Sequence, residues 1–140
     1  MLNTQIYRND HVALGAMIAD FESRLVISKL QADPAECRKL LSNLIGKLRI
    51  HISSEDQLLY PQAASSSNPA IRALAQRFQS EMGPLAIQLK QYSERWLLPR
   101  DIAARPTDFM NESNGIVRAL KERIRRENNE FYSMLEKSAQ

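Results

Sequence analysis

Five polar residues of this sequence stand at positions where a helical pattern would otherwise place apolar side chains: His11, His51, Glu55, Arg123 and Glu127. They include both histidines of the chain. His51 stands four residues before Glu55, and Arg123 stands four before Glu127, so each pair shares one face of a helix. Two imidazoles and two carboxylates form a borderline ligand set that suits Fe(II), Mn(II) or Zn(II).

Burial of these side chains would demand a compensating charge. A buried carboxylate or guanidinium without a partner costs several kcal/mol. With neutral imidazoles the five side chains carry a net charge of minus one, which leaves room for a cation. A structural interpretation stays open beside this one, in which the histidines are hydrogen-bonded core residues and both glutamates pair with Arg123.

The elements that must position these residues are helices, because helix-forming residues are abundant and the chain has only 4 glycines. Capping patterns at Asp33-Pro34-Ala35-Glu36 and Asn68-Pro69 predict helix starts, while Tyr60-Pro61 and Leu98-Pro99 predict helix ends. The first predicted helix ends near Leu30. The second covers residues 34–60 and the third covers 69–98. After a connector over 100–108, the fourth runs from Phe109 to about Leu135. The sequence shows no internal repeat.

Apolar residues recur at alternating spacings of four and three in each predicted helix, which is typical of a left-handed bundle. In the second helix this apolar face carries His51, Glu55 and Leu58. We therefore predict an all-α fold, an antiparallel up-down four-helix bundle. Counting from the connectors at about 1.5 Å per residue places both histidines, Met82 and Arg123 in neighbouring layers, so the polar side chains should meet in the core.

Length and composition restrict the class of protein. The chain has 140 residues, of which 44% are hydrophobic and 25% charged, as expected for one globular domain over 1–140. No apolar stretch approaches the roughly 20 residues of a membrane-spanning helix, and no secretory signal is evident. The lone Cys37 has no disulfide partner, so we expect a cytoplasmic location. A net charge of +3 gives little reason to expect nucleic-acid binding.

The sequence resembles the hemerythrin-like family, also called HHE cation-binding domains. The resemblance spans nearly the whole chain, beginning at Tyr7-Arg8-Asn9-Asp10-His11. Its most specific part is residues 51–61, where His51 is followed by Glu55 and then by Leu59-Tyr60-Pro61. Arg123-Ile124-Arg125-Arg126-Glu127, followed by Phe131-Tyr132, is similar to the signature of the fourth helix.

The resemblance implies two irons between the helices, bridged by carboxylates. One iron would take His11, His51, Glu55 and Glu127, and all four are present. The histidines that would bind the second iron fall at Met82 and Arg123, and neither is an ordinary iron ligand. We therefore expect a degenerate site with at most one iron, in which the Arg123 guanidinium takes the place of the second ion and bridges Glu55 and Glu127.

Three functions follow as hypotheses. The first is a non-enzymatic protein that binds a metal ion, with iron favoured, or senses a small diatomic ligand. The alternative is a metal-free regulatory or protein-interaction module in which Arg123 pairs with Glu55 and Glu127. The third hypothesis is a mononuclear iron oxidase. We expect neither nucleic acid nor membrane as a partner.

Overall fold

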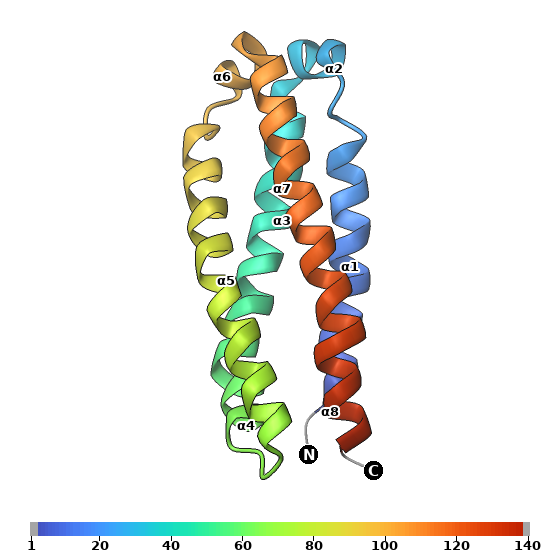
Figure 1. Ribbon diagram of the computed structural model, residues 1–140. Coiled ribbons are helices and arrows are strands. Elements are labelled where there is room, and N and C mark those ends of the chain that lie inside the picture. The colour runs from blue at the N-terminus through green and yellow to red at the C-terminus, as the bar shows by residue number, and fades with distance from the viewer. Residues whose placement is uncertain (1–2, 139–140) are drawn as a thin grey trace.

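The computed structural model describes residues 3–138, and all regular structure in that range is helical. Long helical rods run side by side, and the first and last described helices lie at the same end of the molecule (Figure 1). The first half of the chain forms α1 (Thr4–Glu22), α2 (Ile27–Ala32), α3 (Pro34–Ser54), the π-helical segment η1 (Glu55–Leu59) and α4 (Tyr60–Ala64). The second half forms α5 (Pro69–Arg95), α6 (Pro99–Ala104), α7 (Pro106–Arg126), the π-helical segment η2 (Glu127–Tyr132) and α8 (Ser133–Ser138). The predicted all-α helical bundle is confirmed.

The predicted helix starts are confirmed where side chains cap the backbone. Asp33 accepts a hydrogen bond from the Glu36 N–H, and Asn68 accepts one from the Ala70 N–H. In both cases a proline follows the capping residue, because the first turn of a helix needs no N–H from it. The starts of α3 and α5 are therefore encoded locally.

Two other predicted boundaries are wrong at the far end of the bundle. The first helix ends at Glu22 rather than near Leu30, and α2 begins as a separate helix. The expected connector over 100–108 contains α6, and α7 starts at Pro106 rather than at Phe109. The short helices α2 and α6 pack against each other where the chain crosses the end of the bundle (Figure 1). The tertiary contacts of α2 and α6 fix these boundaries, because local sequence signals alone do not specify them.

The π-helical segments shift the register of the buried face by one residue. The predicted position of Leu58 in the core is wrong: Leu58 is 57% exposed, whereas Leu59 is 1% exposed. A π turn holds one residue more than an α turn, so the buried face moves on by one position. The prediction that Tyr60-Pro61 closes the helix is also wrong, since α4 continues to Ala64. Pro61 is tolerated because the hydrogen-bond ladder is already displaced there, with the Tyr60 N–H bonding five residues back.

The order of elements in the first half of the chain recurs in the second half: long helix, short helix, long helix, π segment, short helix. Three pairs of residues occupy matching places in the two halves: His51 and Arg123, Glu55 and Glu127, Tyr60 and Tyr132. The repeat that the sequence conceals is thus present in the structure. The two halves differ in the residue that stands four positions before the glutamate.

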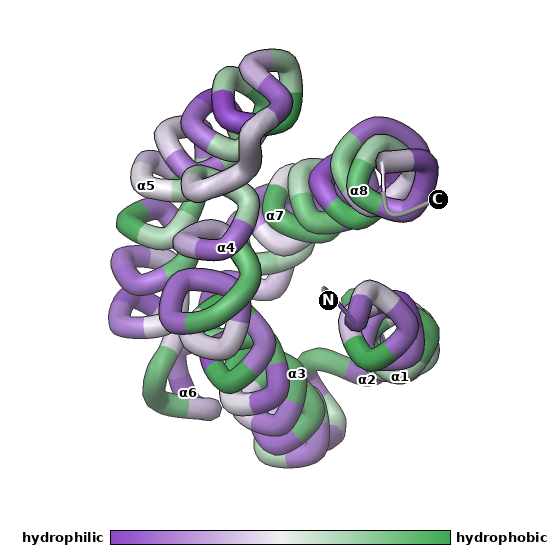
Figure 2. The backbone as a smooth tube through the Cα atoms, turned by 90° about the horizontal axis from the view of Figure 1, so that it is seen from below, coloured by the Kyte–Doolittle hydropathy of each residue, from purple (hydrophilic) through white to green (hydrophobic). Residues whose placement is uncertain are grey.

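Buried apolar side chains form two clusters. The larger includes Leu14, Leu48 and Leu120, and the smaller includes Leu59 and Phe131. The buried charged and imidazole side chains fall between these clusters, so their level has apolar layers above and below it; they are His11, His51, Glu55, Arg123 and Glu127. Hydrophobic and hydrophilic stretches alternate along every helix, as expected of amphipathic helices (Figure 2). Within residues 3–138 no helix is both long and apolar enough to cross a membrane.

The register shift predicts opposite outcomes for two adjacent leucines. Leu59→Ala should lower the free energy of unfolding by about 2–4 kcal/mol, because it leaves a cavity in the smaller apolar cluster. Leu58→Ala is the matched control and should change it by less than about 0.5 kcal/mol, because that side chain is exposed. Chemical denaturation measures both values. The reverse order would show that the helix continues without the π turn.

Candidate metal centre

Four side chains that the sequence singles out meet at the polar level of the bundle. His11 comes from α1 and His51 from the last turn of α3, while Glu55 and Glu127 open the two π segments. None of the four is more than 4% exposed. Three rods therefore contribute nitrogen or oxygen atoms to one dry centre.

These atoms are separated by distances that suit a shared ion. His11 Nε2 lies 3.1 Å from His51 Nε2 and 3.2 Å from Glu127 Oε1, and His51 Nε2 lies 3.0 Å from Glu55 Oε1. Two ligands at right angles around an ion with bonds of about 2.1 Å would be about 3.0 Å apart. One atom each from His11, His51 and Glu127 lies within 4.8 Å of the other two. These three side chains could hold a metal ion, and Glu55 adjoins them at His51.

Hydrogen bonds behind the imidazoles turn both Nε2 atoms toward the centre. His51 Nδ1 lies 3.0 Å from Asp10 Oδ2, and the other oxygen of Asp10 accepts from Lys47. Because a carboxylate only accepts, His51 Nδ1 carries a hydrogen. His11 Nδ1 pairs with Asn128 Oδ1 at 2.7 Å in the same manner. Neutral imidazoles would thus aim two lone pairs at two carboxylates, an arrangement that needs a cation or a proton.

Without a metal ion, a proton on His51 supplies part of that positive charge. Burial opposes a charged imidazole, but the hydrogen bond and the charge of Glu55 outweigh it and raise the pKa of His51 to about 9. Burial, together with the charge of Glu127, raises the pKa of Glu55. At Glu127 burial is outweighed by the hydrogen bond with His11 and by the charge of Arg123, which hold its pKa below the usual value.

The Arg123 guanidinium pairs with only one of the two glutamates expected as its partners, Glu127, and takes two further partners. The predicted bridge to both Glu55 and Glu127 is wrong. Arg123 Nη2 donates to Tyr60 Oη and to the Phe78 carbonyl, each at 2.8 Å, and lies 3.6 Å from Glu127 Oε2. Its Nε and Nη1 are buried without a hydrogen-bond partner among residues 3–138, and its Cζ lies 4.8 Å from the centre of the Phe78 ring. The fixed positive charge therefore sits on the Glu127 side of the centre.

A small cavity of about 20 Å³ opens between the ligand set and Arg123. Met82, the other position expected for a ligand of a second ion, lines it and is 9% exposed. The cavity has room for about one water-sized molecule and none for an organic substrate. A groove of about 680 Å³ lies on the surface between α3 and α5, and Leu48 and Ile52 line both spaces. These two side chains therefore separate the centre from the groove.

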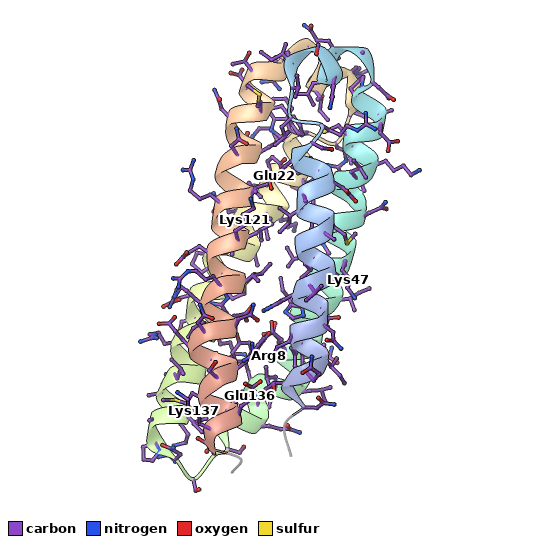
Figure 3. All side chains as sticks on the ribbon, turned by 90° about the vertical axis from the view of Figure 1, so that its right-hand side faces the viewer. Arg8, Glu22, Lys47, Lys121, Glu136 and Lys137 are labelled. Atoms are coloured by element: carbon purple, nitrogen blue, oxygen red, sulfur yellow. The ribbon has the colours of Figure 1, made fainter. Side chains whose placement is uncertain are left out.

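Surface ion pairs join α1 to the rod that contains α7 and α8. Arg8 bonds to Glu136 at 2.7 Å, and Lys121 bonds to Glu22 at 2.8 Å (Figure 3). Arg8 also donates to the backbone carbonyl of Asn128 at 3.1 Å. These contacts join α1 to α7, η2 and α8, and exposed ion pairs of this kind contribute little to stability.

Four residues that touch the ligand set were missed by the sequence analysis: Asp10, Tyr60, Asn128 and Tyr132. Each polar partner of an imidazole adjoins a candidate ligand in the sequence, since Asp10 precedes His11 and Asn128 follows Glu127. That adjacency was the available signal. The tyrosines stand five residues after the two glutamates, and residues at this spacing share a face only across a π turn.

Comparison with known families adds one finding. The family model described as the Hemerythrin HHE cation binding domain matches residues 2–135. Searches among curated proteins and among solved structures gave no match. The matched range covers every residue of the centre.

The stability of the metal-free protein should depend on pH through His51. Its pKa of about 9 lies above the ordinary value of 6.5, so the charged imidazole stabilises the fold fully below about pH 6.5 and loses that effect as pH rises through 9. We expect the free energy of unfolding to fall by at most about 3 kcal/mol over this range, and His51→Gln to flatten the profile. Denaturation of chelator-treated protein at several pH values measures this. Stability that rises over the same range would contradict the assignment.

Proposed function

This chain belongs to the hemerythrin HHE cation-binding domain family, and on that premise we propose that it binds one metal ion through His11, His51, Glu55 and Glu127. Iron is the ion that the resemblance to hemerythrin-like proteins implies, and a set of two imidazoles and two carboxylates suits it. Arg123 and Met82 occupy the positions where ligands of a second ion would stand. The proposal is therefore for at most one ion.

One observation carries this proposal. Two Nε2 atoms lie 3.1 Å apart, and each also faces a carboxylate oxygen at 3.0–3.2 Å. Both imidazoles have their Nδ1 atoms engaged by acceptors on the outer side. The ligand atoms of His11, His51 and Glu127 thus meet at one small volume, which a cation would stabilise. Glu55 Oε1 adjoins this volume at His51.

The side chains around the centre would each act on a bound ion in a distinct way. Asp10 and Asn128 fix the tautomer and orientation of the two imidazoles. Leu48 and Ile52 keep bulk water out, and the cavity beside Arg123 leaves room for one small molecule. A bound iron would supply an open coordination position there. These features favour the binding or sensing of a diatomic ligand over turnover of an organic substrate.

The setting in which the protein works is part of the same proposal. Cys37 is buried and free, and burial raises the pKa of its thiol to about 11, so it is a poor nucleophile and forms no disulfide within the described residues. We propose that the chain acts as one domain in the cytoplasm.

Metal content tests the proposal directly. Protein made without a histidine tag in iron-replete medium should hold about one iron per chain, and His11→Ala and His51→Ala should lose it because each removes a ligand nitrogen. Asp56→Asn is the matched control, since Asp56 is an exposed acid next to Glu55 and should leave the content unchanged. Elemental analysis measures the ratio. Wild-type protein that holds no stoichiometric metal would contradict the proposal.

A metal-free regulatory or protein-interaction module is the second candidate, and the charge balance of the centre favours it. With His51 protonated, its charge and that of Arg123 offset those of Glu55 and Glu127. Such a centre needs no ion to remain folded. If the protein is such a module, wild-type protein should contain no metal, and its stability should not change when iron is added.

The role of Arg123 can be tested with two variants. Arg123→His places an imidazole where the second ion would need one, so iron should rise above one per chain if the guanidinium holds that ion's place. Arg123→Met removes the charge without adding a ligand of that kind and should not raise the iron content. Elemental analysis of both proteins, with circular dichroism to confirm folding, gives the comparison. Equal iron in both variants would refute this role.

A further inference from the structure

Tyr132 is a buried residue of the centre that the proposed ligand set does not use. It ends η2, has no exposed surface, and donates from its hydroxyl to Glu55 Oε2 at 2.7 Å. The Tyr132 hydroxyl oxygen also lies 3.3 Å from His11 Nε2. Glu127 and Tyr132 share one face because the π turn between them spans five residues.

The phenol oxygen is placed like the atoms of the ligand set. Around His11 Nε2 lie three atoms at nearly equal distances: His51 Nε2 at 3.1 Å, Glu127 Oε1 at 3.2 Å and Tyr132 Oη at 3.3 Å. Each separation is close to the distance of about 3.0 Å between neighbouring ligands of one ion. The hydroxyl therefore stands where a further ligand atom would stand.

We propose that Tyr132 is an additional protein ligand of the metal, bound as a phenolate, and that it gives the centre a preference for a trivalent ion such as ferric iron. The inference rests on the proposed function. Three anionic ligands, from Glu55, Glu127 and Tyr132, match the charge of a trivalent ion. A phenolate oxygen is also a harder donor than an imidazole nitrogen, which suits the more highly charged ion.

Ligation breaks the O–H bond of Tyr132 and forms a bond from its oxygen to the ion, with no electron transferred. Glu55 Oε2, which accepts that hydrogen at 2.7 Å, is the first acceptor on the way out, and the proton is finally released to solvent. The Arg8 guanidinium lies 5.7 Å from the centre of the Tyr132 ring and favours the phenolate, although Glu136 offsets part of its charge. Without an ion, burial and the nearby carboxylates raise the pKa of Tyr132 and keep it a phenol.

Tyr60 is the counterpart of Tyr132 in the other half of the chain and provides a matched control. Its hydroxyl donates to Glu127 Oε2 at 3.2 Å and accepts from Arg123 Nη2 at 2.8 Å. It is as buried as Tyr132, at 2% exposure, but it faces a fixed guanidinium instead of an imidazole. A guanidinium stays protonated and has no lone pair to offer, so we expect no metal ion to bind between Tyr60 and Arg123.

The test is the visible absorption of protein loaded with ferric iron, because phenolate bound to ferric iron gives a charge-transfer band that imidazole and carboxylate ligands do not. Wild-type protein and Tyr60→Phe should show the band. Tyr132→Phe should lose it, keep about one iron per chain at saturating iron, and bind ferric iron about 10- to 100-fold more weakly. Loading with gallium(III), which is redox-inert, should produce the ultraviolet difference spectrum of a phenolate in wild-type protein and in Tyr60→Phe.

The outcomes separate this inference from the proposed function. Wild-type protein that binds iron stoichiometrically without the band overturns the role of Tyr132 and leaves the four-residue site intact. A band that persists in Tyr132→Phe also overturns it, whereas absence of bound iron overturns the proposed function itself. If Tyr132→Phe does not fold, the variants Tyr60→Phe and Tyr7→Phe identify the tyrosine by elimination. Tyr92 is excluded because it bonds to Ser113 in the larger apolar cluster. A band that both variants retain therefore comes from Tyr132.

Discussion

Two carboxylates buried between two apolar clusters are the constraint on which the rest of this structure depends. Left without partners, each would cost several kcal/mol. The groups that surround Glu55 and Glu127 either carry positive charge or donate hydrogen bonds: Arg123, His51, Tyr60 and Tyr132. The bundle is therefore built around a requirement for positive charge at one level, and the apolar layers above and below it make that requirement strict.

The two π-helical segments are the device that assembles these partners. In a regular α-helix, residues five apart point in different directions, so Tyr132 would turn away from Glu127. The extra residue in each π turn returns the tyrosine to the face of its glutamate and carries its hydroxyl to the carboxylate of the opposite half. The crossed pattern, Tyr60 to Glu127 and Tyr132 to Glu55, joins the two halves of the chain at the centre.

The fold class and the convergence of His11, His51 and Glu127 could be predicted because they depend on helical periodicity and on local capping, as at Asp33 and Asn68. What could not be predicted depends on the departure from that periodicity. The exposure of Leu58 and the continuation past Pro61 both follow from a π turn that has no clear sequence signal. The partners of Arg123 escaped prediction for another reason: Tyr60 and the Phe78 carbonyl compete for the guanidinium, and α-helical spacing placed neither of them beside it.

The two halves differ in whether their positive charge can be exchanged. Arg123 keeps its proton under all ordinary conditions, so the charge on its side is fixed. His51 can give up its proton, and a metal ion can take that place. Replacing this proton by a divalent ion adds one unit of charge to a buried centre. A trivalent ion adds the same single unit if Tyr132 loses its proton as well, so the phenol would let the centre hold either charge state of iron at one net charge. In a dry core that equality matters, because a change in uncompensated charge is costly.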